Sequence, residues 1–102
     1  MNRTIKKFHD GKTGAAMTLA LQYGAKATKV TKFQNDGTVN IALVCTAPGI
    51  EADKELIQFL AATLNVDEKN LELLAGSDEN KLISIVDISP EEVDKIFRAL
   101  LS

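Results

Sequence analysis

Few residues of this chain have the type and spacing that catalysis needs. His9 and Asp10 could act as a general base with its orienting acid, but side chains adjacent in a chain seldom face one another. We interpret the pair as part of a surface turn. Cys45 could serve as a nucleophile or a redox thiol. It ends an apolar stripe and the chain has no second histidine to activate it, so we expect a buried structural thiol.

Ligands for a metal or a cofactor are equally scarce. One histidine and one cysteine do not make a closed zinc site. Asp53, Glu55, Asp78 and Glu79 could bind a hard cation weakly, but their spacing matches no calcium loop. The run Gly11-Lys12-Thr13-Gly14 resembles the end of a phosphate-binding loop, without the residues and the strand that precede one. The sequence therefore predicts no metal, no cofactor and no catalytic residue.

Charge is distributed unevenly along the chain. Residues 1–32 carry seven basic residues and one acidic residue, a net charge of +6, whereas the remainder carries a net charge of −8. Such a split can mark a surface that faces a polyanion, or two halves that attract one another in the folded protein. Lysines near aromatic side chains can bind single-stranded nucleic acid. Basic residues lie near Phe8, Tyr23 and Phe33 in the sequence, and the candidate nucleic-acid surface is formed by Lys26, Lys29 and Lys32.

Composition is typical of a globular domain. Hydrophobic residues make up 45% of the 102 residues and charged residues 25%, which predicts a single domain, 1–102, with residues 1–13 frayed. No apolar run has the roughly 18 residues of a membrane helix, and the N-terminus does not resemble a signal peptide. A single cysteine excludes an internal disulfide. We expect a cytoplasmic monomer without membrane contact.

Periodicity and turn residues predict the elements that position these side chains. We expect strands over 16–22, 29–33, 38–45, 71–75 and 82–86, with a further short strand between Ile5 and Phe8. Asn35-Asp36-Gly37 predicts a hairpin. A helix over 51–64 ends at Asn65, and Ser89-Pro90-Glu91-Glu92 predicts the start of a second helix through a capping box.

The order β-β-β-α-β-β-α predicts an α+β fold. We expect two layers, with a mixed sheet of four or five strands and two helices on one face. The apolar stripe of the first helix contains Leu60, and that of the second contains Phe97, Leu100 and Leu101. A crossover from the strand at 38–45 through the first helix to the strand at 71–75 could form a parallel pair.

From roughly Gly14 onward the chain resembles the YggU-like family of small, uncharacterised proteins. The resemblance follows the strand 17–22, then 25–29, Asn35–Ile41 and Thr46-Ala47-Pro48, the helix at 56–61, the turn at Asn65-Val66, and 71–76 followed by Lys81. It covers most of the chain and implies the same two-layer α+β fold. The family has no biochemical function known to us, so the resemblance bears on fold more than on activity.

The two signature loops of this family differ here. The first typically reads A-P-P-V-(D/E)-G-x-A-N; the corresponding stretch, 47–53, is shorter and has Asp53 in place of Asn. The second typically reads G-x-(T/S)-x-R-x-K; the stretch 76–81 is shorter and lacks the Arg. A retained core with altered loops would also be typical of a redesigned member. The resemblance implies a loop site formed by Pro48, Glu51, Asp53, Gly76 and Lys81.

Three hypotheses about function follow. The absence of a nucleophile–base pair, a metal cluster and a cofactor loop favours a non-enzymatic scaffold or binding domain, with weak binding of single-stranded nucleic acid as an alternative. An acid–base enzyme is the third possibility, with Glu51 or Asp53 acting together with Lys81. That reading requires the two loops to meet at one end of the sheet.

Overall fold

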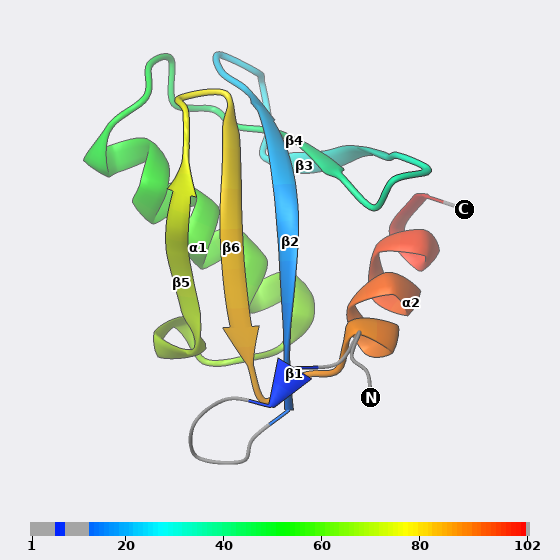
Figure 1. The fold of residues 1–102 in the computed structure, drawn as a ribbon. Coiled ribbons are helices and arrows are strands. Elements are labelled where there is room, and N and C mark those ends of the chain that lie inside the picture. Colours follow the sequence, from blue (N-terminus) through cyan, green and yellow to red (C-terminus); the bar gives the residue numbers. More distant parts are fainter. Residues whose placement is uncertain (1–5, 8–12, 102) are drawn as a thin grey trace.

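The protein consists of one mixed sheet with two helices packed against one of its faces (Figure 1). The computed structural model describes residues 6–7 and 13–101. The strands are β1 (Lys6–Lys7), β2 (Thr13–Gln22), β3 (Lys29–Phe33), β4 (Val39–Ala42), β5 (Leu71–Gly76) and β6 (Asn80–Val86). The helices are α1 (Ile50–Leu64), the short 3-10 helix η1 (Glu68–Asn70) and α2 (Pro90–Leu101). The expected order is confirmed, with β1 preceding it; Ile5 and Phe8 lie outside the described residues.

Strand β2 is the centre of the sheet. The strand order is β3-β4-β2-β6-β5, and β1 pairs with β2 at its N-terminal end. Only β2 and β4 form a parallel pair among these strands; β3 with β4, β2 with β6, β5 with β6 and β1 with β2 are antiparallel. The mixed sheet of four or five strands predicted from the sequence is therefore confirmed, and the short strand β1 is a sixth strand beside it.

The expected neighbour of β4 was wrong. We expected the crossover through α1 to place the strand at 71–75 beside the strand at 38–45. The two strands run in the same direction, but β2 and β6 lie between them. The reason is that β6 pairs with β2 and also forms a hairpin with β5. The chain therefore crosses one face of the sheet through α1 and reaches β5 at the edge opposite β3.

Two glycines make the hairpin turns possible. Gly37 has a φ of +92°, and its turn is closed by a 2.8 Å bond from Gln34 N to Thr38 O. Gly76 has a φ of +125°, and a Cβ at this position would lie 2.1 Å from the carbonyl oxygen of Asn80. The Asp-Gly hairpin predicted between the strands at 29–33 and 38–45 is confirmed. Gly76 is required by both its backbone conformation and its surroundings.

The core lies between the sheet and both helices. Met17 and Leu19 are alternate residues of β2, and their side chains point toward the helices. They belong to one buried cluster with Leu60 of α1 and Phe97 of α2. Leu60 and Phe97 are fully buried, as the sequence predicted. The rings of Phe33 and Phe97 are 6.4 Å apart, which joins α2 to the edge strand β3.

Helix ends match the sequence signals, whereas some apolar positions do not. Asn65 is left-handed (φ 58°) at the end of α1, and the Ser89 hydroxyl accepts a 3.1 Å bond from the Glu92 amide at the start of α2. Leu100 and Leu101 are 52% and 41% exposed, because the last turn of α2 is not covered by the core. No helix within residues 13–101 is long and apolar enough to cross a membrane.

Candidate functional site

Three segments meet at one end of the sheet and form what we call the loop end: residues 23–28, 43–53 and 76–81 (Figure 1, top). The amides of Gly24 and Ala25 donate to the carbonyl oxygens of Cys45 and Leu43, each at 2.9 Å. The Tyr23 hydroxyl donates to the carbonyl oxygen of Asp78 in the β5–β6 turn. The two loops that the family resemblance singles out therefore lie at the same end of the sheet.

The strand expected over 38–45 is shorter than predicted at this end. β4 ends at Ala42, and the chain bends from Val44 to Gly49 before α1 begins. Val44, which lies beyond the end of β4, is 47% exposed. Cys45 is half-buried and not buried as expected, because it lies beyond the end of β4. Its side chain packs against the core, and its thiol donates to the Ala47 carbonyl oxygen at 3.5 Å.

Tyr23 lies between the two loops. Partial burial raises the pKa of its phenol, and the negative charges of Asp78, Asp53 and Glu79 raise the pKa further. The phenol therefore stays protonated at neutral pH and acts as a hydrogen-bond donor to the turn. A tyrosine with this environment holds the loops together and is a poor proton acceptor.

Glu55 is the most engaged carboxylate of the loop end, and the sequence did not single it out from its acidic neighbours. Its two oxygens accept bonds from the amides of Val44 at 2.6 Å and Cys45 at 2.9 Å, and from the Thr28 hydroxyl at 2.5 Å. Partial burial works to raise the pKa of Glu55, but these three bonds outweigh it and hold the pKa below its ordinary value. Glu55 thus connects α1 to the loop that contains Thr28 and to the loop that contains Val44 and Cys45.

The five loop-site residues do not form an acid–base pair. Pro48 and Glu51 are exposed, Asp53 and Lys81 are half-buried, and Gly76 ends β5. The Lys81 ammonium donates to the carbonyl oxygen of Ser77 at 3.2 Å. No ion pair or hydrogen bond joins Lys81 to Glu51 or Asp53 in residues 13–101, and no cluster of His, Cys, Asp or Glu in this part of the chain could hold a metal. His9, Asp10, Gly11 and Lys12 lie outside the described residues.

The three lysines proposed to bind nucleic acid are exposed on and beside the edge strand β3. Lys29 and Lys32 belong to β3, and Lys26 precedes it in the loop end. None of the three forms an ion pair with a described acidic residue. Phe33 is not available for stacking on a base, because it packs against Phe97 and the Arg98 guanidinium lies 4.9 Å from its ring centre.

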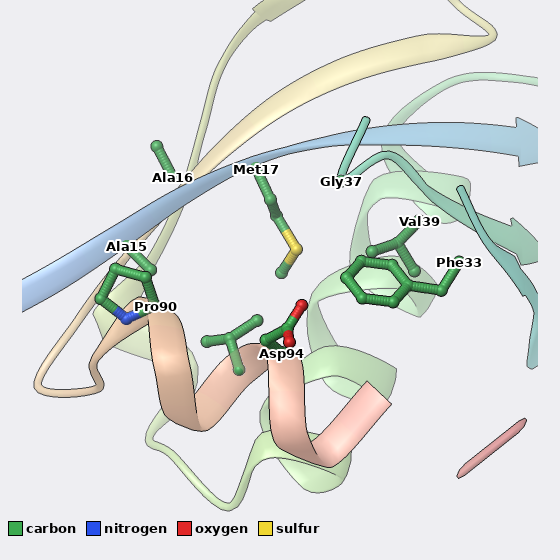
Figure 2. Close-up of a pocket in the computed structure, with 9 residues that line it drawn as sticks. Ala15, Ala16, Met17, Phe33, Gly37, Val39, Pro90 and Asp94 are labelled. Carbon is green, nitrogen blue, oxygen red and sulfur yellow. The ribbon is translucent and has the colours of Figure 1, made fainter. Parts of the chain in front are cut away.

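A groove between β2, the β3–β4 hairpin and α2 is the feature that sequence patterns did not predict. It encloses about 130 Å3. Met17, Phe33 and Val39 line it from the sheet and the hairpin, and Pro90, Val93 and Asp94 line it from α2. Figure 2 shows Met17 and Asp94 directed into the same hollow. We call it the β2–α2 groove. Its residues come from three distant parts of the sequence, so no local motif marks it.

No protein-family model matches the chain.

Proposed function

We propose that the protein is a non-enzymatic binding domain and that the β2–α2 groove is its binding site. The observation that carries this proposal is the difference between the two ends of the molecule. At the loop end, Glu55, Tyr23 and Lys81 are bonded to backbone groups of the loops. In the groove, apolar side chains and one carboxylate surround a hollow.

The groove suits a branched aliphatic group attached to a cation. A volume of about 130 Å3 corresponds to roughly four water molecules, which is enough for one aliphatic side chain. Met17 and Val93 supply apolar contact. The Asp94 carboxylate accepts a 2.8 Å bond from Arg98 through Oδ2, and its other oxygen is an acceptor at the side of the groove. Sites of this kind combine apolar surface with a few polar groups that orient the ligand.

Amide chemical shifts of the labelled protein during titration with isoamylamine test this proposal. We expect saturable shifts confined to residues 15–17, 37–39 and 90–94, with weaker shifts for the neutral isoamyl alcohol and none for ethanolamine, which lacks the branched chain. Shifts that are scattered or do not saturate would contradict the proposal. Val93→Phe, which fills the hollow, should remove the response; Val44→Phe, at the opposite end, is the matched control.

Weak binding of single-stranded nucleic acid is a second candidate. It is supported by the exposure of Lys26, Lys29 and Lys32 without acidic partners among the described residues. Binding should fall steeply with salt, because phosphate contacts release counterions. A fluorescence titration with an unstructured oligonucleotide at low and moderate salt tests it. Absence of binding at low salt, or equal binding by a variant with all three lysines changed to Glu, excludes this surface.

We also propose that the chain is a monomer and is related to the YggU-like proteins. The residues quoted for the resemblance support the relationship, together with the two-layer fold that the resemblance implies. Light scattering on the purified chain measures the oligomeric state, and a mass twice that of the chain would exclude a monomer.

A further inference from the structure

The tip of the β3–β4 hairpin carries Asp36-Gly37, a sequence in which the aspartate side chain is open to attack by the backbone nitrogen that follows it. Glycine has no Cβ, so nothing on residue 37 shields its nitrogen from the carboxyl carbon of the preceding side chain. Both residues are exposed to solvent. Whether they react therefore depends on how the turn holds the nitrogen and the carboxyl group.

The turn has a defined backbone geometry. The Gly37 amide donates to the Gln34 carbonyl oxygen at 3.0 Å, which closes a four-residue turn over 34–37. Asn35 and Asp36 have negative φ, whereas Gly37 has a φ of +92°. Negative φ at both central residues of a hydrogen-bonded turn identifies type I, and a left-handed glycine then leads into the next strand.

Both reacting groups are engaged in other hydrogen bonds while this turn is closed. The Gly37 nitrogen donates its hydrogen within the turn, and the Thr38 amide donates to Asp36 Oδ1 at 2.9 Å. The bond from Thr38 holds the pKa of Asp36 below its ordinary value of 3.8, so the carboxylate stays ionised at neutral pH. An ionised carboxylate is a poor target for a nucleophile, because its oxygen leaves as water only from the protonated acid. The closed hairpin therefore opposes the reaction that its sequence favours.

We propose that Asp36 is a site of isoaspartate formation and that opening of the β3–β4 hairpin controls the reaction. In the open hairpin, the Gly37 nitrogen attacks Cγ of the protonated Asp36 carboxyl group. A bond between this nitrogen and Cγ forms, and the bond between Cγ and one carboxyl oxygen breaks. That oxygen leaves as water with the carboxyl proton and the amide proton. The product is a five-membered succinimide ring.

Water then opens the ring, and the two directions of opening give different products. Addition of water at Cγ restores aspartate. Addition at the backbone carbonyl carbon of Asp36 breaks the bond between this carbon and the Gly37 nitrogen, and the chain then continues through Cγ as isoaspartate. One water molecule is released and one is consumed, so the net reaction is an isomerisation that needs no other reactant.

Isoaspartate adds one carbon atom to the backbone between residues 36 and 37. The bonds across the turn require the original spacing, so we expect the modified hairpin not to close in the same register. Phe33 and Val39 pair across this hairpin, and both line the β2–α2 groove together with Gly37 (Figure 2). The modification should therefore remove binding in the groove. Only this consequence rests on the proposed function; the reaction itself does not.

Comparison of the folded and the unfolded chain tests the proposal. The full chain is incubated at neutral pH in buffer and in concentrated guanidinium chloride, and mass spectrometry with electron-transfer fragmentation distinguishes isoaspartate from aspartate at position 36. We expect the product in guanidinium chloride and formation slower by roughly tenfold or more in buffer, because only the open fraction of the hairpin reacts. Equal rates in both, or no isoaspartate at Asp36 in guanidinium chloride, would overturn the proposal. Asp10-Gly11 is a second pair of this kind in the sequence, and its peptide is analysed separately.

A variant that loosens the hairpin tests the controlling step in the folded protein. The Gln34 side chain donates to Asn40 Oδ1 at 2.7 Å across the hairpin, and Gln34→Ala removes this bond without changing Asp36 or Gly37. Hydrogen exchange of the Gly37 amide, followed by NMR, reports how often the turn opens. We expect Gln34→Ala to accelerate this exchange and isoaspartate formation by the same factor, since both start from the open hairpin. Gln58→Ala, at an exposed glutamine of α1, is the matched control and should change neither rate.

The two rates decide whether opening controls the reaction. Faster exchange with unchanged isoaspartate formation, or the reverse, would overturn opening as the controlling step. If Gln34→Ala changes neither rate, guanidinium chloride below the unfolding transition supplies the opening, and the two rates must still rise together.

A binding measurement tests the consequence for the groove. The isoaspartate form, separated by chromatography, should lose the saturable isoamylamine shifts that the unmodified chain shows. Retained shifts would overturn the link between the hairpin turn and the groove. Absence of shifts in the unmodified chain would contradict the proposed function and leave the measured isomerisation unaffected.

Discussion

Glu55 should contribute more to stability than any other acidic residue of α1. Its carboxylate accepts three hydrogen bonds, two from backbone amides and one from the Thr28 hydroxyl. Hydrogen bonds to a charged group contribute about 1.5–3 kcal/mol each when buried. Val44 is exposed and Glu55 only half-buried, so water can replace part of each bond. We therefore expect Glu55→Ala to lower the free energy of unfolding by about 2 kcal/mol in total, similar to the loss of a strong helix cap.

Urea denaturation followed by circular dichroism measures this loss. A decrease of about 2 kcal/mol should lower the urea midpoint by about 1 M with an unchanged slope. Glu51→Ala is the matched control, because Glu51 is an exposed acid in the first turn of the same helix. Its effect should stay within about 0.5 kcal/mol. A loss below about 0.5 kcal/mol for Glu55→Ala, or an equal loss for the control, would refute the reasoning.

The pH dependence of the same residue has a definite sign. Hydrogen bonds hold the folded-state pKa of Glu55 below its ordinary value of 4.5. Its ionised form therefore stabilises the fold above about pH 4.5, and this contribution is lost as the pH falls through the folded-state pKa. The wild-type protein should lose more free energy of unfolding than Glu55→Gln between about pH 5 and about pH 3. Parallel curves for the two proteins would contradict this assignment.

Three other predictions follow from packing, backbone conformation and charge. Phe97→Ala should cost about 3–5 kcal/mol in the free energy of unfolding, because the ring is fully buried; a loss below about 1 kcal/mol would mean that α2 is misplaced. Gly76→Ala should destabilise the fold more than Gly24→Ala. Both glycines have a positive φ, but only at Gly76 would the added Cβ clash with backbone atoms. Equal melting temperatures of the two variants would contradict this. Tyr23 is the single tyrosine, so an ultraviolet pH titration should show its pKa raised from 10.0 and lowered again in Asp78→Asn; identical titration curves would exclude the charge effect.

The candidate loop site shows where sequence reasoning was sufficient and where it was not. The loops at 47–53 and 76–81 were selected from a resemblance, and they do lie at one end of the sheet. Which acid forms hydrogen bonds there depends on the direction in which each side chain points. Glu55 accepts bonds from the amides of Val44 and Cys45, whereas Glu51, one helical turn earlier, is exposed. Both are acids near the start of the same helix, so their sequence environment does not distinguish them.

Local features of the fold were determined by the sequence. Asp36-Gly37 predicts a hairpin because glycine accepts a positive φ, and Ser89 predicts a helix start because its hydroxyl accepts from an amide three residues ahead. The buried positions of Leu60 and Phe97 follow from helical spacing. These properties depend on residues a few positions apart, which the sequence places together.

Only the tertiary structure decided how these elements are combined. The pairing of β2 with both β4 and β6, the exposure of Leu100, and the β2–α2 groove all depend on contacts between residues far apart in the chain. Several strand orders satisfy the same pattern of apolar and polar residues, because the pattern states which face is buried and not which strand is adjacent.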